Sequence, residues 1–331
     1  MSGAHLSYYE LNHALTVQPK LIAFVSTLDS PERARWLSGL SECLQNAVVI
    51  DFAQMSFEQK QSCPIAIVAN PDPADMLMLP NLQWIQSVWA GVEGLVQNLP
   101  DNRVPIVRLV DPQLAKTMTE AVLAWTLYLH RDMPAYSRAQ RLGQWQPRDY
   151  IKPEKRRIGV LGLGELGRAS CLALQSAHFM VQGWSREPKE IAGLRCFSGL
   201  DSLDSLLSTT DILVCLLPLT PLTRRLLDAR ALALLPKSAS IINFARGLIV
   251  DDEALHSALD SGHLNHAVLD VFATEPLPAS SWHWNHPSVT ITPHVSAPTD
   301  LETASAIVCA NVNRYFASGQ IPVAINPATG Y

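Results

Sequence analysis

A glycine-rich turn follows directly on a short apolar run near the middle of the chain. The run, residues 157–161 (RIGVL), has the branched character of a buried strand, and the segment GLGELG leads from it into a helical pattern of apolar residues. In such a unit the first glycine permits a tight turn, the second lets a pyrophosphate approach the backbone, and the third lets the helix pack closely on the strand. The helix N-terminus favours an anion. We therefore expect a dinucleotide to contact Gly162, Gly164, Glu165, Leu166 and Gly167.

Strand-length apolar runs alternate with helical or loop segments on both sides of this turn. One series covers about residues 21–111, and a second covers about residues 157–292. Alternation of this kind predicts parallel sheets layered with helices. Between the two series we expect a long, mostly apolar helix over residues 114–131, which Pro134 ends.

The last helical pattern covers residues 301–318. Thr299 and Asp300 can cap its start, and Gly319 can stop it. No strand of its own follows this helix, so we expect it to pack back across the first series. The second series of strands would then be inserted into the first.

A chain of 331 residues is too long for one ordinary core and suits two domains. We expect an α/β protein with two doubly wound parallel-sheet domains, in which a Rossmann-type dinucleotide domain is inserted in a flavodoxin-like substrate domain. The expected boundaries are residues 111–297 for the dinucleotide domain, and residues 1–110 with 298–331 for the substrate domain.

Composition limits the partners of the chain. Apolar residues make up 48% and charged residues 17%, the net charge is −5, and the pI is near 6.0. This balance gives no general attraction to nucleic acid or to an anionic membrane. No apolar run approaches the roughly 20 residues of a membrane span. The first twenty residues hold no continuous apolar block, so we expect no signal peptide and a loose extension to about Gln18.

Six cysteines lie far apart, without a Cys-x-x-Cys pair, and most stand inside apolar segments. Such cysteines are typical of reduced core thiols. We therefore expect a cytoplasmic protein without a disulfide framework.

The strand expected after the glycine-rich unit, residues 179–184, carries information about the cofactor. An acid at its end would bind a free ribose 2′-hydroxyl, but the chain continues with Ser185 and Arg186, and Lys189 follows. The guanidinium of Arg186 matches a 2′-phosphate, so NADPH is favoured and NADH is the weaker possibility. Arg186 as a solvated loop residue is the alternative, which the nearby Glu187 keeps open. The missing acid also counts against an S-adenosylmethionine-dependent methyltransferase.

Three polar residues stand just beyond three later apolar runs. The runs are residues 239–243, 267–271 and 289–292, and the polar residues are Arg246, Glu275 and His294. Ligands bind at the carboxyl ends of parallel strands, so these side chains are expected to face a site. Taken singly, they could be a surface ion pair, a turn residue beside proline, and a buried histidine. Together, beside a dinucleotide turn, they indicate a catalytic trio.

Reduction of a 2-oxo acid by hydride transfer needs a proton donor at the carbonyl oxygen and a cation for the carboxylate. His294 suits the donor, because imidazole titrates near neutral pH. Glu275 could hold one ring nitrogen of His294 and stabilise its imidazolium form. Arg246 could bind the carboxylate through a fork that lysine lacks.

Two histidine pairs, His263 with His266 and His283 with His286, could indicate a metal site. No carboxylate or cysteine stands at a spacing that completes either pair, and both pairs fall in turn-rich segments. We expect no metal.

Several motifs of the second series resemble the D-isomer-specific 2-hydroxyacid dehydrogenases. The matching segments are VLGLGELG (160–167), LLPLTPLT (216–223), NFARGLIVDDEAL (243–255), LDVFATEPLP (269–278) and HPSVTITPH (286–294). The resemblance implies the split two-domain fold, a homodimer built through the dinucleotide domain, and the roles given above for the trio. It also implies that the cofactor site includes Pro218, Thr223, Asn243 and Asp270.

Within that family the chain is most similar to the bacterial glyoxylate and hydroxypyruvate reductases of the A type. An Ala-Gly-Val-acid turn, here Ala90, Gly91, Val92 and Glu93, would bind the substrate carboxylate through backbone N–H groups. Glutamate stands at 93 where aspartate is usual. The bulk of Trp89, where a small residue is common, could narrow the substrate pocket or face the core.

The resemblance thus implies NADPH-dependent reduction of small 2-oxo acids, with glyoxylate giving glycolate and hydroxypyruvate giving D-glycerate. A dehydrogenase of a bulkier 2-oxo acid is one alternative. A non-enzymatic sensor of NAD(P)(H) is another, because transcriptional corepressors share this fold and the trio.

Overall fold

The computed structural model describes residues 20–99 and 104–326, which form two compact units. The expected extension to Gln18 lies outside the described residues. The smaller unit consists of the described parts of Met1–Val88, Asn98–Val107 and Ser305–Ala324. The larger unit consists of the described parts of Trp89–Gln97, Arg108–Ala304 and Ile325–Tyr331. The chain leaves the smaller unit after Val107 and returns to it at Ser305–Ala324, so most of the larger unit is inserted between parts of the smaller one.

The smaller unit is built on five parallel strands in the order β2-β1-β3-β4-β5, the flavodoxin-like order. Every residue of β3 is buried, as helices on both faces of a parallel sheet require. Its strands are β1 (Lys20–Ser26), β2 (Ala47–Asp51), β3 (Ile65–Ala69), β4 (Trp84–Ser87) and β5 (Ile106–Val107). Its helices and 3₁₀ turn are α1 (Ser30–Cys43), η1 (Phe52–Gln54), α2 (Phe57–Ser62), α3 (Pro73–Leu77) and most of α11 (Leu301–Ser318).

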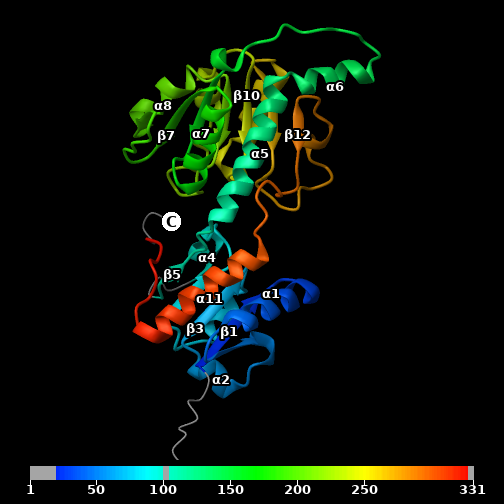
Figure 1. Cartoon of the computed structure of the whole chain (residues 1–331). Coiled ribbons are helices and arrows are strands. Elements are labelled where there is room, and N and C mark those ends of the chain that lie inside the picture. The colour runs from blue at the N-terminus through cyan, green and yellow to red at the C-terminus, as the bar shows by residue number, and fades with distance from the viewer. Residues whose placement is uncertain (1–19, 100–103, 327–331) are drawn as a thin grey trace, which may run out of the picture. The chain divides into compact units, whose positions relative to one another are not determined.

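The larger unit contains a seven-stranded parallel sheet in the order β12-β11-β10-β9-β6-β7-β8 (Figure 1). Counted from β6 this is the Rossmann order, with the strand sequence reversing between β6 and β9. Its strands are β6 (Arg157–Leu161), β7 (Met180–Ser185), β8 (Arg195–Ser198), β9 (Ile212–Cys215), β10 (Ala239–Asn243), β11 (Leu264–Leu269) and β12 (Val289–Ile291). The expected fold class is confirmed.

Helices cover both faces of the larger sheet. Alternate residues of β6 explain this: Ile158 and Val160 pack against α5 and α7 on one face, whereas Leu161 joins the leucines of α8, α9 and α10 on the other. The helices of the unit are α4 (Glu93–Asn98), α5 (Pro112–His130), α6 (Met133–Arg141), α7 (Glu165–Ser176), α8 (Leu200–Leu207), α9 (Ala229–Leu234) and α10 (Asp252–Asp260). The 3₁₀ turns are η2 (Pro153–Lys155), η3 (Gly247–Ile249) and η4 (Trp282–Asn285).

The role expected for Pro134 needs correction. The long helix α5 does end at His130, but Asp132 takes a left-handed conformation (φ 55°) and a second helix, α6, begins at Met133. Proline fits the first turn of a helix because the N–H groups there have no partner inside the helix. Pro134 therefore starts α6 rather than ending α5.

Within residues 20–99 and 104–326, no helix is long and apolar enough to cross a membrane.

The last helix, α11, has the predicted bounds and belongs mostly to the smaller unit. The Asp300 carboxylate accepts a hydrogen bond from the Thr303 N–H at 2.8 Å, and Gly319 follows the helix at φ 73°. Asn311 of α11 donates to the buried Gln86 of β4 at 3.0 Å. The predicted cap, stop and packing are thus confirmed.

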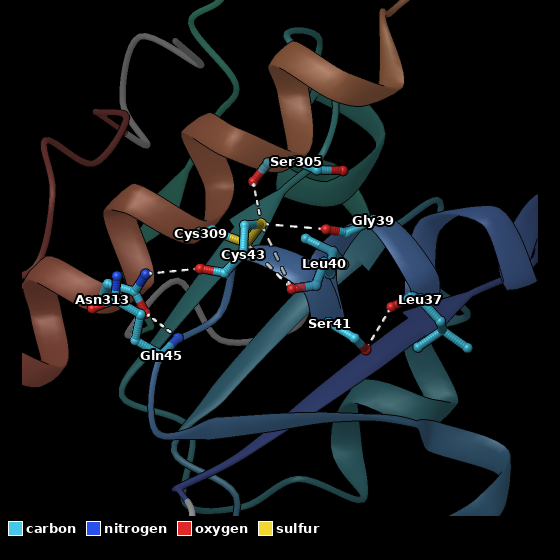
Figure 2. Close-up of a disulfide and its surroundings, with 9 residues drawn as sticks. All are labelled: Leu37, Gly39, Leu40, Ser41, Cys43, Gln45, Ser305, Cys309 and Asn313. Carbon is cyan, nitrogen blue, oxygen red and sulfur yellow. Dashed lines mark hydrogen bonds between the residues drawn. A yellow bond between two sulfur atoms is a disulfide. The ribbon is translucent and has the colours of Figure 1, made fainter.

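The expectation of six reduced thiols is wrong for one pair. Cys43 at the end of α1 and Cys309 of α11 form a disulfide, with their Cα atoms 5.8 Å apart (Figure 2). The sequence separation of 266 residues hid this pair, because only the packing of α11 on α1 brings the two together. The other four cysteines are free, and burial raises the pKa of the thiols of Cys171 and Cys215 to about 12.

We expect a reductant to lower the melting temperature of the oxidised protein. A crosslink across so long a loop restricts the unfolded chain and is worth about 2–5 kcal/mol, or roughly 5–15 °C for a unit of this size. Thermal unfolding with and without dithiothreitol measures the effect. Cys43→Ser and Cys309→Ser should abolish the response, whereas Cys196→Ser should keep it. An unchanged melting temperature on reduction of the wild type would contradict the crosslink.

Candidate active site

The glycine-rich turn after β6 has the backbone geometry that its spacing predicts. Gly162 lies at φ 100°, and a Cβ there would stand 2.7 Å from the carbonyl oxygen of Leu216. A Cβ on Gly167 would stand 1.7 Å from the carbonyl oxygen of Gly162, so α7 packs directly against the turn. A Cβ on Gly164 would meet no atom within 4 Å. The backbone at Gly164 is therefore open to a close ligand.

Helix α7 begins beside this open backbone. Gly164 is its N-cap residue and provides no side-chain acceptor, and Glu165 and Leu166 form the first turn. Over twelve residues the helix dipole adds partial positive charge at this end. The first turn of α7 thus fits a pyrophosphate.

The end of β7 holds the residues expected to select the cofactor. Ser185 is buried and its hydroxyl donates to the carbonyl oxygen of Glu187 at 2.7 Å. The Arg186 guanidinium pairs with the Glu187 carboxylate at 2.9 Å, and Lys189 is exposed nearby in sequence. A 2′-phosphate at Arg186 would therefore compete with Glu187.

The loop after β9 lies beside the point where the strand order reverses. There the Thr223 hydroxyl donates to the carbonyl oxygen of Pro218 at 2.6 Å. The Thr220 hydroxyl lies 3.1 Å from the Thr223 hydroxyl and forms a hydrogen bond with it. These contacts close the loop on itself. Because β9 pairs with β6, this loop and the glycine-rich turn stand at neighbouring strand ends.

The trio follows three strands that are neighbours in the larger sheet. β12, β11 and β10 are adjacent and parallel, so the loops that carry His294, Glu275 and Arg246 leave the same edge. Strand β10 has the predicted bounds, whereas β11 ends at Leu269 and β12 at Ile291, slightly earlier than the apolar runs. The three residues thus stand in loops that follow neighbouring parallel strands.

Glu275 and His294 form a pair. The Glu275 carboxylate accepts from Nδ1 of His294 at 2.7 Å and, through its other oxygen, from the N–H of Phe272 at 2.9 Å. With its Nδ1 proton directed at Glu275, the ring presents Nε2 to a ligand. The His294 side chain is 51% exposed, so a ligand can reach it.

Asp270 builds the loop that presents His294. This buried carboxylate accepts from the N–H groups of Val295 and Ser296 at 2.8 and 2.9 Å and from the Thr292 hydroxyl at 2.7 Å. The N–H of His294, which lies at φ 54°, donates to the Asp270 carbonyl oxygen. In addition to the cofactor role implied by resemblance, Asp270 thus has a structural one. Sequence reasoning missed Thr292 and Ser296.

Asn243 holds the loop that carries Arg246 through hydrogen bonds to its backbone, as Asp270 holds the loop of His294. Its side-chain N–H donates to the Arg246 carbonyl oxygen at 3.1 Å, and its amide oxygen accepts from the Ala245 N–H at 3.2 Å. A Cβ on Gly247 would lie 2.0 Å from the carbonyl carbon of Phe272. The loop that carries Arg246 is therefore in contact with the one that carries Glu275.

The Arg246 side chain also contacts the Ala90–Val92 turn. Its Nη2 lies 3.2 Å from the Glu93 carboxylate, and a Cβ on Gly91 would stand 1.7 Å from the same nitrogen. Trp89 and the turn group with Arg246 in the larger unit, with Trp89 half-buried and Val92 buried. The sequence gives no signal for the Glu93 contact, because 153 positions separate the two residues.

The structure brings carboxylates to the second histidine pair, which the sequence spacing did not show. Asp252 lies 2.9 Å from His283, and Asp260 lies 3.2 Å from His286 and 3.4 Å from His256. Nδ1 of His286, however, accepts from the Ser288 N–H at 3.1 Å. Its Nε2 therefore carries the proton, whereas a metal ligand would need Nε2 unprotonated and Nδ1 as the donor. We propose no metal here.

His266 of the first pair lies in the core of the larger unit, and burial lowers its pKa to about 4. In the unfolded chain the His266 imidazole takes up a proton near pH 6.5, whereas in the folded chain it does so only near pH 4. Acid should therefore remove stability between about pH 6.5 and 4, by at most roughly 3 kcal/mol. Urea unfolding at several pH values measures this, with His266→Gln expected to flatten the dependence and His178→Gln to leave it. Equal acid sensitivity of wild type and His266→Gln would contradict the prediction.

The chain is similar to known proteins in sequence and in fold. Residues 123–296 match the D-isomer specific 2-hydroxyacid dehydrogenase family, NAD binding domain. The chain therefore belongs to this family of dehydrogenases, and its larger unit carries the NAD-binding domain.

The names of individual relatives specify the enzyme more closely than the family description does. It is 36% identical over 89% of its length to glyoxylate/hydroxypyruvate reductase A of Yersinia enterocolitica, of which the match covers 95%. A D-isomer specific 2-hydroxyacid dehydrogenase from Xanthobacter autotrophicus, solved with NADPH and MES, is 38% identical with a TM-score of 0.86, over 95% of this chain and 100% of that one. An NADPH-dependent glyoxylate/hydroxypyruvate reductase from Sinorhizobium meliloti, solved with NADP and sulfate, is 30% identical with a TM-score of 0.86, over 94% and 100%.

Proposed function

We propose that the protein reduces small 2-oxo acids with NADPH, converting glyoxylate to glycolate and hydroxypyruvate to D-glycerate. The observation that carries this proposal is the paired Glu275 and His294 at a strand end next to the loop of Arg246, on the sheet that holds the glycine-rich turn. The names of the relatives support the substrate and the cofactor.

Each residue of the trio has a distinct task in this reaction. When bound, the nicotinamide supplies a hydride to C2 of the 2-oxo acid. His294 donates the proton from Nε2 to the carbonyl oxygen, and Glu275 stabilises the charged ring before the transfer. Arg246 binds the substrate carboxylate together with the N–H groups of the Ala90–Val92 turn. The products are the 2-hydroxy acid and NADP⁺.

Steady-state assays with NADPH and NADH against a panel of 2-oxo acids test this proposal. We expect turnover of glyoxylate and hydroxypyruvate, and slower turnover of bulkier acids because of Trp89. Faster turnover of a bulky acid would show a dehydrogenase of a different specificity. No turnover of any acid, with NADPH still binding, would favour a sensor of NAD(P)(H).

Arg186 should determine the preference for NADPH. Replacing it by alanine removes the guanidinium that pairs with the 2′-phosphate, so KM for NADPH should rise roughly 10- to 100-fold while KM for NADH stays near the wild-type value. Glu187→Gln is the matched variant, because it removes the carboxylate that competes with the 2′-phosphate for Arg186 and should lower KM for NADPH. An equal loss with both cofactors would place the 2′-phosphate elsewhere.

We propose that the protein is a homodimer joined through α6 and the adjoining segment 142–152. Leu142, Trp145 and Tyr150 are 69%, 97% and 63% exposed on this long connection without helix or strand (Figure 1). Large exposed apolar side chains on one segment are typical of a surface that another protein chain covers, and a second copy of this chain is the partner proposed here. Light scattering should give twice the mass of the 36.4 kDa chain, and Trp145→Ser should weaken the dimer.

We further propose a cytoplasmic location, supported by the four free cysteines. The Cys43–Cys309 disulfide would then form only under oxidising conditions. Alkylation of thiols in intact cells before lysis tests this, because a disulfide already formed in unstressed cells would contradict it.

A further inference from the structure

Glu93 is the acidic residue that contacts Arg246, and its carboxylate has no role in the reaction as proposed. It stands in the first turn of α4, directly after the Ala90–Val92 turn. Its carboxylate lies 3.2 Å from Nη2 of Arg246, and only 15% of its side chain is exposed. The Arg246 side chain is 33% exposed, so the ion pair is partly buried and orients the two side chains more strongly than a pair on an open surface does.

A second contact holds the other terminal nitrogen of Arg246. Nη1 donates to the carbonyl oxygen of Ala245 at 2.7 Å, while Nη2 pairs with Glu93. Two anchors on the two terminal nitrogens define both the position and the plane of the guanidinium. Of its five N–H groups, three remain for other acceptors.

The guanidinium also fills the space over Gly91. A Cβ at this position would stand 1.7 Å from Nη2 and 3.0 Å from the Glu93 carboxylate, so only glycine leaves room for the pair. The backbone that would bind one side of the substrate carboxylate thus touches the side chain that would bind the other side. Displacement of Arg246 would separate these two halves of the carboxylate site.

We propose that Glu93 is a positioning residue, which holds the guanidinium of Arg246 against the Ala90–Val92 turn in the orientation that receives the carboxylate of a 2-oxo acid. This inference rests on the proposed function of Arg246. Glu93 acts through Arg246 and does not itself bind the substrate. Its effect should therefore vanish when Arg246 is absent.

A double-mutant cycle tests the proposal. Glu93→Ala should lower kcat/KM for glyoxylate roughly 10- to 100-fold, mainly through a higher KM, and leave KM for NADPH unchanged. Glu93→Gln, which keeps an acceptor for Nη2, should recover most of the loss. With Arg246→Ala already present, adding Glu93→Ala should change kcat/KM, or oxamate binding to the NADPH complex, by less than about twofold.

Glu253→Ala is the matched control, because Glu253 is an exposed acid in the first turn of another helix, α10. It should behave as wild type. A Glu93→Ala enzyme with wild-type KM, or a full Glu93 effect in the Arg246→Ala background, would overturn the proposal while leaving the reductase function intact. Wild-type protein that turns over no 2-oxo acid would overturn both. Melting temperatures of all variants separate a general loss of folding from the KM effect.

Discussion

Replacing His294 by asparagine is expected to lower kcat for glyoxylate by roughly 10²- to 10⁴-fold, the usual contribution of a general acid. Nε2 of His294 is the atom that faces outward once Nδ1 is held by Glu275 at 2.7 Å. Asparagine suits this position because the backbone there lies at φ 54°, which asparagine tolerates better than alanine. Steady-state kinetics with saturating NADPH measure the loss.

His178→Asn is a close control for this substitution. His178 is also exposed and also has a positive φ, of 66°, but it precedes β7, far in sequence from the trio. It should keep wild-type kinetics. The variant at His294 should still bind NADPH, because the glycine-rich turn is untouched. Near-normal turnover of His294→Asn would show that another group donates the proton.

The features that the sequence predicts well are those recorded in consecutive residues. The run at 239–243 has the bounds of β10 because buried parallel strands need continuous apolar residues. The glycine spacing at 162–167 predicts the turn because a side chain at Gly162 or Gly167 would clash with neighbouring backbone, and one at Gly164 would fill the space open to a ligand. The order of strands then brings Arg246, Glu275 and His294 to one edge without further information.

The features that the sequence does not predict depend on contacts between distant segments. Cys43 and Cys309 meet only because α11 packs on α1. Asp260 reaches His286 only because α10 lies beside the turn before β12. Glu93 likewise pairs with Arg246 although 153 positions separate the two residues. Such pairs leave no periodic or local pattern, so a single sequence contains no signal for them.

Arg246→Ala is expected to lower kcat/KM for glyoxylate by roughly 10³- to 10⁴-fold, because it removes the cation that binds the substrate carboxylate and orients the carbonyl toward His294. Arg246→Lys should still lose about 100-fold. A lysine ammonium is a point charge, and it cannot contact the Ala245 carbonyl oxygen, Glu93 and a substrate carboxylate with the fixed geometry of a guanidinium.

The loss at Arg246 should be specific to the 2-oxo acid. KM for NADPH should stay unchanged, and the control Arg230→Ala, which breaks an exposed ion pair with Asp204, should keep wild-type kinetics. Arg246→Ala also leaves the shielded Glu93 carboxylate without its ion-pair partner, so a modest fall in melting temperature should accompany the loss of activity. Adding Glu93→Gln to Arg246→Ala should restore the melting temperature but not the turnover. Wild-type activity in Arg246→Lys would mean that charge alone suffices and that the fork geometry has no part in binding the substrate.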